Sequence, residues 1–413
     1  GSNIIIVVND NDMSIAENHG GLYSNLKLLR DTKGQAENNF FKTLGFDYYY
    51  IDNGHDFNEL ISVFDRVKDA DHPVLVHMHT IKGKGLHEAE VDKEHYHWIV
   101  PGELDKKPVA ENAIRKESYE SITADYILDR ASKDSSIIAI SPATPGVSGF
   151  TPEFRKKLGK NYVDVGIAEE HAVAFASGLA KGGAKPMLAV MSSFIQRTYD
   201  QLSQDLALNN TPATLLIFWG GITGMDATHL SKYDIPLIPN IVYLAPVNKE
   251  EYISMMDWAN SQSEHSVVIR VPFTQVISTG EKDTTDYSKI NKYQVVESGS
   301  EVAILGLGNF FHLGVKVKDA LKANLGISAT LINPHFISGV DEELMESLKA
   351  NHKLVITLED GAIEGGFGEK IASYFGNSDM KVLNFGARKE FTDRVPLEEL
   401  YQRYRLTPEL IVD

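Results

Sequence analysis

Short apolar runs alternate with amphipathic segments along the whole chain. The runs have the length and the Val, Ile and aromatic content of buried strands. They span residues 3–8, 47–52, 72–79, 135–140, 162–166, 186–191, 213–219, 240–246, 266–271, 301–308, 328–333 and 352–359. Helical patterns lie between many of them, for example at 55–70, 117–133 and 340–351. Continuous apolar strands separated by helices are typical of parallel sheets that helices cover on both faces.

Two polar stretches, at 101–118 and 278–294, interrupt this alternation of strands and helices. They predict three α/β units, at 1–110, 118–282 and 290–413. The first unit has too few strands for a complete doubly wound domain. We therefore expect three doubly wound α/β domains with mainly parallel sheets, of which the first is incomplete.

Composition and charge narrow the functional classes. The 413 residues are 43% hydrophobic and include no cysteine, which excludes disulfides, thiolate zinc sites and thiol nucleophiles. A formal charge of −17 argues against a nucleic-acid partner. No apolar run reaches the roughly 20 residues of a membrane helix. These features predict a cytoplasmic protein that binds neither nucleic acid nor membrane.

Polar side chains gather where predicted strands end, which is where open α/β sheets bind ligands. Asn11 lies between two aspartates after the first strand, and these oxygens suit Mg²⁺ or Ca²⁺, although a turn leaving the strand would use the same residues. Glu169 and Glu170 follow the strand at 162–166. Their carboxylates either face a cleft or only stabilise the start of a helix through its dipole.

Two further segments carry candidate chemistry. Phe194 and Arg197 follow the strand at 186–191, and together they could hold a flat heterocycle and an anion, or could be core packing beside a surface arginine. The Gly-rich loop 220–229 contains Asp226 and His229, which favours a functional loop. A flavin or nicotinamide site is disfavoured, because the glycine turn at 306–308 lacks the full fingerprint.

These segments together resemble the thiamine-diphosphate enzymes of the transketolase superfamily, and most closely the 1-deoxy-D-xylulose-5-phosphate synthase family. The likeness rests on "NDNDMSI", "KGKG", "DVGIAEEHAVAFASGLA", "SSFIQRTYDQLSQD" and "EGGFG", which occur in the family's order and spacing. It implies thiamine diphosphate and Mg²⁺ as cofactors and a homodimer as the assembly. It also implies decarboxylation of pyruvate and transfer of the two-carbon unit to an aldehyde such as glyceraldehyde 3-phosphate.

The resemblance assigns a role to particular residues. Asn11 would bind Mg²⁺ through its side-chain oxygen and Met13 through its carbonyl. Glu169 would bond the aminopyrimidine ring of the cofactor, and Phe194 would stack on that ring. The other implied cofactor contacts are Ile15, Lys82, Ile167 and Arg197, and the implied acceptor or proton-transfer residues are His97, Asp226 and His229.

The sequence also departs from the family's pattern. A Gly-Asp-Gly segment with a metal-binding aspartate would precede Asn11, so we expect about a third of a family-length chain to be absent. Trp219, Phe273 and Met191 occupy the positions of the family's phosphate-binding side chains, and Glu170 replaces a common glutamine. Two alternatives follow from these differences. One is a related enzyme with a non-phosphorylated acceptor, and the other is a catalytically inert subunit.

Overall fold

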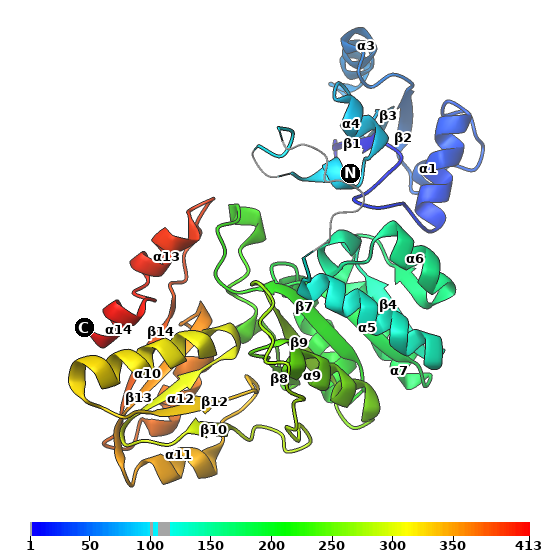
Figure 1. The fold of residues 1–413 in the computed structure, drawn as a ribbon. Helices are drawn as coiled ribbons and strands as arrows, with labels where there is room; N and C mark the ends of the chain where they lie inside the picture. Colours follow the sequence, from blue (N-terminus) through cyan, green and yellow to red (C-terminus); the bar gives the residue numbers. More distant parts are fainter. Residues whose placement is uncertain (1, 100–101, 106–115) are drawn as a thin grey trace. The chain divides into compact units, whose positions relative to one another are not determined.

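The structure is a computed structural model that describes residues 2–99, 102–105 and 116–413. The chain divides into two compact units, residues 1–114 and 115–413, which are described separately (Figure 1). No helix among the described residues is long and apolar enough to cross a membrane.

The first unit is built on a parallel three-stranded sheet in the order β1–β3–β2. Its strands are β1 (Ile5–Asp10), β2 (Asp47–Ile51) and β3 (Val74–His79). Its helices are α1 (Gly21–Asp31), α2 (Phe40–Thr43), α3 (Phe57–Val67), α4 (His87–Val91) and the 3₁₀ helix η1 (His95–His97). Val74 and Val76 pack under α3, whereas Leu75 packs with residues of α1. Because alternate residues of a strand point to opposite faces, helices cover both faces of this sheet.

The second unit contains a parallel six-stranded sheet in the order β5–β4–β6–β7–β9–β8. Its strands are β4 (Ile137–Ser141), β5 (Tyr162–Asp164), β6 (Lys185–Met191), β7 (Thr214–Gly220), β8 (Val242–Leu244) and β9 (Val267–Pro272). The strand order reverses direction between β4 and β6. Such a switch point leaves a crevice at the carboxyl ends of the strands, where ligands bind in this class of fold.

Helices cover both faces of this sheet as well. One face carries α5 (Tyr119–Lys133), α6 (Pro152–Leu158) and α9 (Lys249–Ser261). The other carries α7 (Glu169–Lys181) and a second helical stretch made of α8 (Tyr199–Gln201) and the π-helix η5 (Leu202–Leu208). Short 3₁₀ helices η2 (Pro145–Ser148), η3 (Gly159–Asn161), η4 (Ile195–Thr198), η6 (Ala227–His229) and η7 (Ile235–Leu237) lie in the connections.

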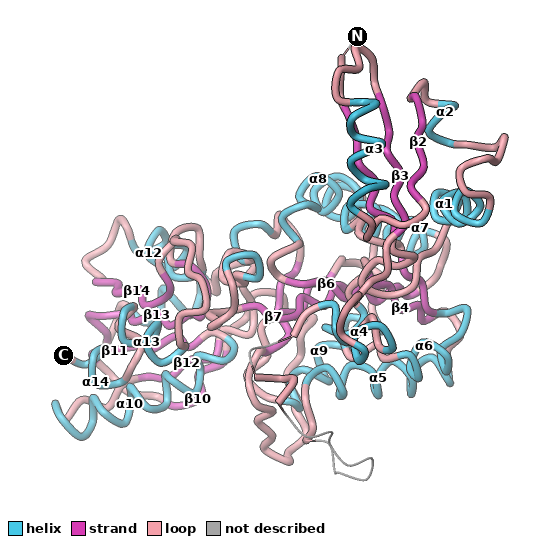
Figure 2. Tube along the Cα trace, turned by 90° about the horizontal axis from the view of Figure 1, so that it is seen from above, coloured by secondary structure: helices cyan, strands magenta, loops and turns pink. Residues whose placement is uncertain are grey.

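A five-stranded sheet follows in the same unit, in the order β10–β12–β11–β13–β14. Its elements are β10 (Gln294–Glu297), β11 (Glu301–Gly306), η8 (Gly308–Phe310), α10 (Phe311–Leu325), β12 (Thr330–Asn333), α11 (Glu342–Leu348), β13 (His352–Ala362), α12 (Phe367–Phe375), β14 (Lys381–Ala387), α13 (Leu397–Arg403) and α14 (Pro408–Val412). Only the β10–β12 pairing among them is antiparallel. Figure 2 shows α10 and α12 on opposite sides of this sheet.

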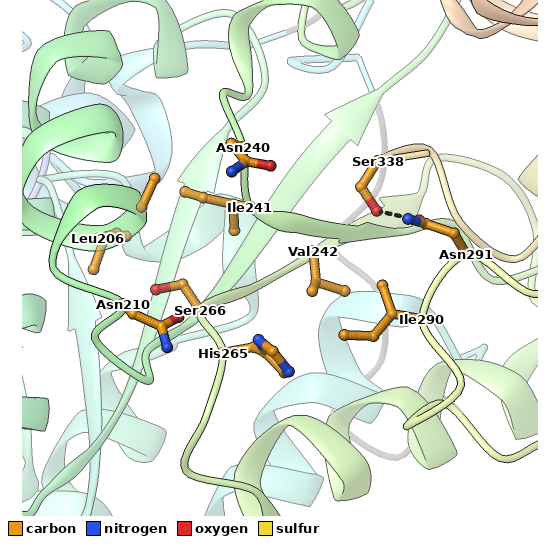
Figure 3. A pocket seen from close by; sticks show the side chains of 11 residues that line it. Leu206, Asn210, Asn240, Ile241, Val242, His265, Ser266, Ile290, Asn291 and Ser338 are labelled. Atoms are coloured by element: carbon orange, nitrogen blue, oxygen red, sulfur yellow. Dashed lines mark hydrogen bonds between the residues drawn. The ribbon is translucent and has the colours of Figure 1, made fainter. Parts of the chain in front are cut away.

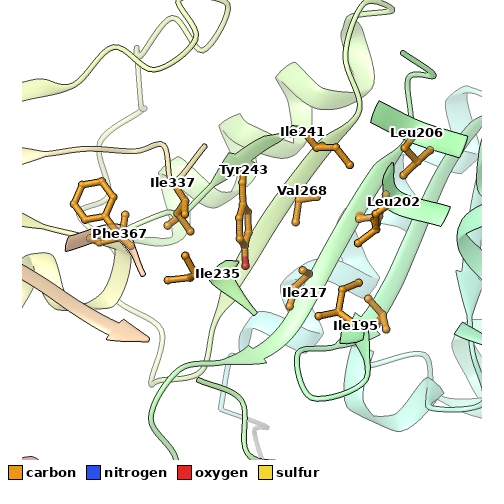
Figure 4. Close-up of a cluster of buried hydrophobic side chains, with 14 of the residues drawn as sticks. Ile195, Leu202, Leu206, Ile217, Ile235, Ile241, Tyr243, Val268, Ile337 and Phe367 are labelled. Atoms are coloured by element: carbon orange, nitrogen blue, oxygen red, sulfur yellow. The ribbon is translucent and has the colours of Figure 1, made fainter. Parts of the chain in front are cut away.

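The two sheets of the second unit share one hydrophobic core. The largest cluster of buried side chains includes Leu188 and Ile217 of the six-stranded sheet together with Leu305 of the five-stranded sheet and Phe367 of α12. In Figure 4, Tyr243 lies between Val268 on one side and Ile337 on the other. The sheets are therefore packed into a single body.

The structure confirms the α/β fold with mainly parallel sheets. Every strand predicted from the apolar runs is present, and so are the helices predicted at 55–70, 117–133 and 340–351. Strands β10 and β14 lie outside the predicted runs. The linker predicted at 278–294 contains no helix or strand before β10, whereas most of the linker predicted at 101–118 lies outside the described residues. The division into three domains stays a prediction.

Candidate active site

A buried carboxylate stands at the carboxyl edge of the six-stranded sheet. Glu169 is the first residue of α7, which begins shortly after β5, and only 1% of its surface is exposed. Nη1 of Arg197 lies 2.9 Å from both carboxylate oxygens of Glu169. The helix start adds a favourable field for a negative charge. The sequence therefore places an oriented carboxylate beside the switch point.

An aromatic ring lies against the same guanidinium. Arg197 belongs to η4, directly after Phe194, and its Cζ lies 5.2 Å from the centre of the Phe194 ring. This geometry is a cation–π contact. Ser193 directly precedes Phe194, and its Oγ is buried without a hydrogen-bond partner among the described residues. An unpaired buried hydroxyl beside a partly exposed ring is what a site for a polar heterocycle would provide.

The loop after β7 adds an imidazole to this cluster. The ring centres of His229 and Phe194 are 6.1 Å apart, and His229 Nδ1 lies 2.9 Å from Asp226 Oδ1. Burial acts to raise the pKa of Asp226, but hydrogen bonds from Thr228 and His229 outweigh it and lower that pKa well below its ordinary value. Asp226 is therefore a charged acceptor that orients the His229 ring.

The structure thus brings together five of the predicted site residues of the second unit. They are Glu169, Arg197, Phe194, His229 and Asp226. Ile167 lies two residues before Glu169 with 58% of its surface exposed, and Glu170 is also exposed.

The three positions that differ from the family's phosphate ligands lie at the ends of β6, β7 and β9. Met191 is buried, whereas the rings of Trp219 and Phe273 pack with their centres 5.3 Å apart. Arg270 of β9 is the cation nearest to these positions along the strand. Its side chain is only 5% exposed and forms ion pairs with Asp234 and Asp360. Arg270 therefore has a structural role. Its two partners could not be identified from the sequence because they lie far away along the chain.

In the first unit, the polar residues after β1 form a turn with hydrogen bonds. Asn11 Oδ1 accepts a hydrogen bond of 3.3 Å from the Met13 amide. Asp10 is buried and contacts Arg30 and His77. Burial raises the pKa of Asp10, but the hydrogen bonds from His77 and Arg30 prevail and lower it to about 2. Arg30 comes from α1, and no sequence signal marked it as the partner of this turn.

The remaining predicted residues of the first unit lie near this turn or in η1. Nζ of Lys82 bonds the Ser14 carbonyl and lies 3.5 Å from the Ile15 carbonyl. Burial lowers the pKa of Lys82. Ile15 is half-buried, and His97 is an exposed residue of η1.

Each unit, taken by itself, has groups that suit the implied cofactor. Asn11 Oδ1 and the Met13 carbonyl are hard oxygen donors of the kind that Mg²⁺ takes, and diphosphate and water oxygens would complete its coordination. Within the described part of the chain, no three Asp, Glu or His side chains converge on a metal position. In the second unit, Glu169, Phe194 and the unpaired Ser193 Oγ match an aminopyrimidine, which offers ring nitrogens, an amine and a flat face.

A separate cavity of about 270 Å³ opens at the other end of the sheet (Figure 3). It lies beside the first residues of β8 and β9, and Asn291 and Ser338 close one wall with a hydrogen bond of 2.9 Å. Because Glu169 and His229 follow the carboxyl ends of their strands, this cavity is not part of the cluster around Glu169.

Comparison with known proteins agrees with this geometry. Residues 28–80 match the family profile "1-deoxy-D-xylulose-5-phosphate synthase". Residues 116–276 match "Transketolase, pyrimidine binding domain", and residues 291–411 match "Transketolase, C-terminal domain". The chain is 32% identical to the 1-deoxy-D-xylulose-5-phosphate synthase of Clostridium tetani, over 99% of the chain and 72% of that protein. The enzyme of the same name from Alkaliphilus oremlandii is 33% identical, again over 99% of the chain and 72% of that protein.

Solved structures share the fold. A split-gene transketolase, described as an inactive β4 tetramer, superposes with a TM-score of 0.62 at 20% identity. The match covers 72% of this chain and 96% of that one. A transketolase from Pichia stipitis in complex with sedoheptulose 7-phosphate gives a TM-score of 0.59 at 14% identity, over 99% of this chain and 71% of that one.

Fold and site together define a transketolase-like enzyme. Parallel α/β sheets place a buried glutamate, an aromatic ring and a histidine–aspartate pair at one edge. The sequence identity to the curated relatives then narrows the class: the chain belongs to the 1-deoxy-D-xylulose-5-phosphate synthase family. Members of this family are transferases that depend on thiamine diphosphate, with Mg²⁺ as the usual metal.

Proposed function

We propose that this chain decarboxylates pyruvate and transfers the two-carbon unit to glyceraldehyde 3-phosphate, with thiamine diphosphate and Mg²⁺ as cofactors. The observation that carries the proposal is the buried Glu169 carboxylate, which Arg197 holds beside the Phe194 ring. The family relationship favours this function over an inert subunit and over a related enzyme with a non-phosphorylated acceptor.

Glu169 would hold a proton in common with a ring nitrogen of the aminopyrimidine. When bound, thiamine diphosphate supplies the nucleophilic carbon and the electron sink that decarboxylation needs. The double contact with Arg197 keeps the Glu169 carboxylate in one orientation, which a shared proton requires. Phe194 would stack on the pyrimidine face, and Ile167 would border it.

His229 would exchange a proton with the acceptor's oxygen. Its Nδ1 lies beside Asp226, which favours the tautomer with the proton on Nδ1, so Nε2 is the ring nitrogen that can accept a proton. Asp226 is the positioning partner of this imidazole and stays ionised because of its lowered pKa. The family relationship gives His97 of the first unit a role toward the acceptor as well.

Residues of the first unit would hold the charged end of the cofactor. Asn11 and Met13 offer the two oxygen donors for Mg²⁺. The Lys82 ammonium is already fixed by the Ser14 carbonyl and would face the diphosphate. Ile15 would line the pocket next to it.

Substitution at Glu169 tests the proposal. In the full protein, Glu169→Gln should lower the rate of CO₂ release from pyruvate by about 100-fold or more, because the shared proton is lost. Glu120→Gln removes a carboxylate from the first turn of α5 in the same unit and is the matched control. Undiminished decarboxylation by Glu169→Gln would contradict the assigned role, and a wild-type protein without carboligation activity would contradict the function itself.

We further propose a homodimer in the cytoplasm. The outer side of α7 presents small and apolar residues around a hollow of about 540 Å³, which includes Ala174, Phe175 and Gly178. Such a face suits close packing against a second copy. The absence of cysteine fits a reducing compartment. Light scattering on the full protein tests the assembly, and a monomer at micromolar concentration would exclude it.

A further inference from the structure

The loop that carries Asp226 and His229 is held from outside by the last part of the chain. We call residues 221–231 the catalytic loop and residues 388–396 the C-terminal strap. The strap connects β14 to α13, which are both labelled in Figure 1. The Arg394 amide donates to the Met225 carbonyl at 2.9 Å, and the Ala227 amide donates to Asp393 Oδ1 at 3.2 Å. These two bonds join the strap to the residues on either side of Asp226.

Glycines let the loop approach the five-stranded sheet and the strap closely. A Cβ on Gly224 would lie 3.0 Å from the Val395 carbonyl oxygen. Gly221 has a φ of +134°, and a Cβ there would lie 2.5 Å from an Asp360 carboxylate oxygen. A side chain at either position would push the loop away from its support. The two glycines of the catalytic loop therefore permit its close contact with the strap and the five-stranded sheet.

The support continues beyond the loop. The Tyr233 hydroxyl bonds the Glu390 carbonyl, and its ring packs 6.3 Å from that of Phe391. Within the loop, Asp226 Oδ1 accepts from the Thr228 amide at 3.0 Å and faces His229 Nδ1. A shift of Ala227 would therefore move Asp226 and, through it, the imidazole.

We propose that Asp393 is a positioning residue for the acceptor step. By fixing Ala227, its carboxylate sets the place of His229 relative to Phe194 and Glu169, although Asp393 itself contacts neither the cofactor nor the reacting atoms. The part of the chain that forms the five-stranded sheet thereby takes part in catalysis through the C-terminal strap. This inference rests on the proposed function, since it assigns His229 to proton exchange with the acceptor.

The test separates positioning from stability. Asp393 keeps 63% of its side chain exposed, so its replacement leaves no buried charge and the variants should fold. Asp393→Ala should raise the acceptor KM or lower the acceptor-dependent kcat by about threefold to tenfold, the effect of one lost hydrogen bond. The rate of pyruvate decarboxylation without acceptor and the affinity for thiamine diphosphate should stay at the wild-type level.

Two variants complete the experiment. Asp393→Asn retains an oxygen acceptor for the Ala227 amide and should restore acceptor kinetics close to wild type. Asp379→Ala removes an exposed carboxylate from the loop before β14, at the opposite end of that strand, and should have no effect.

The proposal fails if Asp393→Ala has wild-type acceptor kinetics, if Asp393→Asn behaves like Asp393→Ala, or if both partial reactions decline equally. A wild-type protein without any carboligation would instead overturn the proposed function. The two failures are therefore distinguishable.

Discussion

Replacement of Arg270 by methionine should destabilise the second unit strongly. The guanidinium of Arg270 bonds Asp234 through two nitrogens, at 2.7 and 3.1 Å, and Asp360 through a third. The side chains of both aspartates are at most 6% exposed. Without the arginine, two carboxylates would stay buried without a counter-charge. Breaking a buried pair from one side typically costs about 3–5 kcal/mol.

The position of the three residues adds to this expectation. Asp234 precedes η7 in the connection between β7 and β8, whereas Asp360 lies in β13 of the other sheet. The ion pairs therefore tie the two sheets together, and their loss should lower the stability of both. For a unit of this size, a loss of about 3–5 kcal/mol corresponds to roughly 5–8 °C in Tm.

Urea unfolding, followed by far-UV circular dichroism, measures the change through the midpoint and slope of the transition. Arg130→Met is the control, because Arg130 pairs with Asp257 at a site where both side chains are at least 40% exposed, and it should cost less than about 1 kcal/mol. The triple variant Arg270→Met, Asp234→Asn, Asp360→Asn should recover part of the loss, since no charge remains buried. A cost below about 1 kcal/mol for Arg270→Met would refute the reasoning.

Two further predictions concern pH and the acceptor. Burial raises the pKa of Glu359 from 4.5 to about 7, so the folded state binds more protons than the unfolded state between these values and stability falls as pH rises through them. At 1.36 kcal/mol for each pKa unit, the unfolding free energy of Glu359→Gln should rise relative to that of wild type by roughly 3 kcal/mol between pH 4.5 and 7.5, measured by urea unfolding. The exposed Glu369→Gln should show no such rise. If stability depends on pH in the same way in Glu359→Gln and wild type, the effect is excluded. Trp219→Arg should lower the KM for glyceraldehyde 3-phosphate about tenfold, because a guanidinium would meet the phosphate. Leu208→Arg, at a position that is 75% exposed, controls for charge alone, and an equal change in both variants would rule out a local contact.

The apolar runs sufficed to predict the parallel strands, because a strand buried on both faces needs a continuous hydrophobic stretch. The edge strands β10 and β14 were not predicted, for the opposite reason. All four residues of β10 are exposed, and β14 alternates exposed with half-buried positions over its first residues. Edge strands need apolar residues on one face at most, so their sequences resemble loops.

The candidate site could be predicted to a similar extent. Glu169, Phe194 and His229 each follow the carboxyl end of a strand, and such ends meet at one edge of a parallel sheet. The ion pairs of Arg270 could not be predicted, because its partners lie 36 and 90 residues away. The support of the catalytic loop by Asp393 spans 166 residues and left no local signal either.

The hydrophobic core shared by the two sheets of the second unit has a practical consequence for handling the protein. Within the second unit, residues 278–286 are mostly exposed and free of regular structure, so a protease should cut there. The two fragments would still share the core that contains Leu188 and Ile217 from one fragment and Leu305 and Phe367 from the other. The fragments of a nicked protein should therefore co-elute in size-exclusion chromatography and separate only in denaturant. Either fragment expressed alone would expose hydrophobic surface and precipitate.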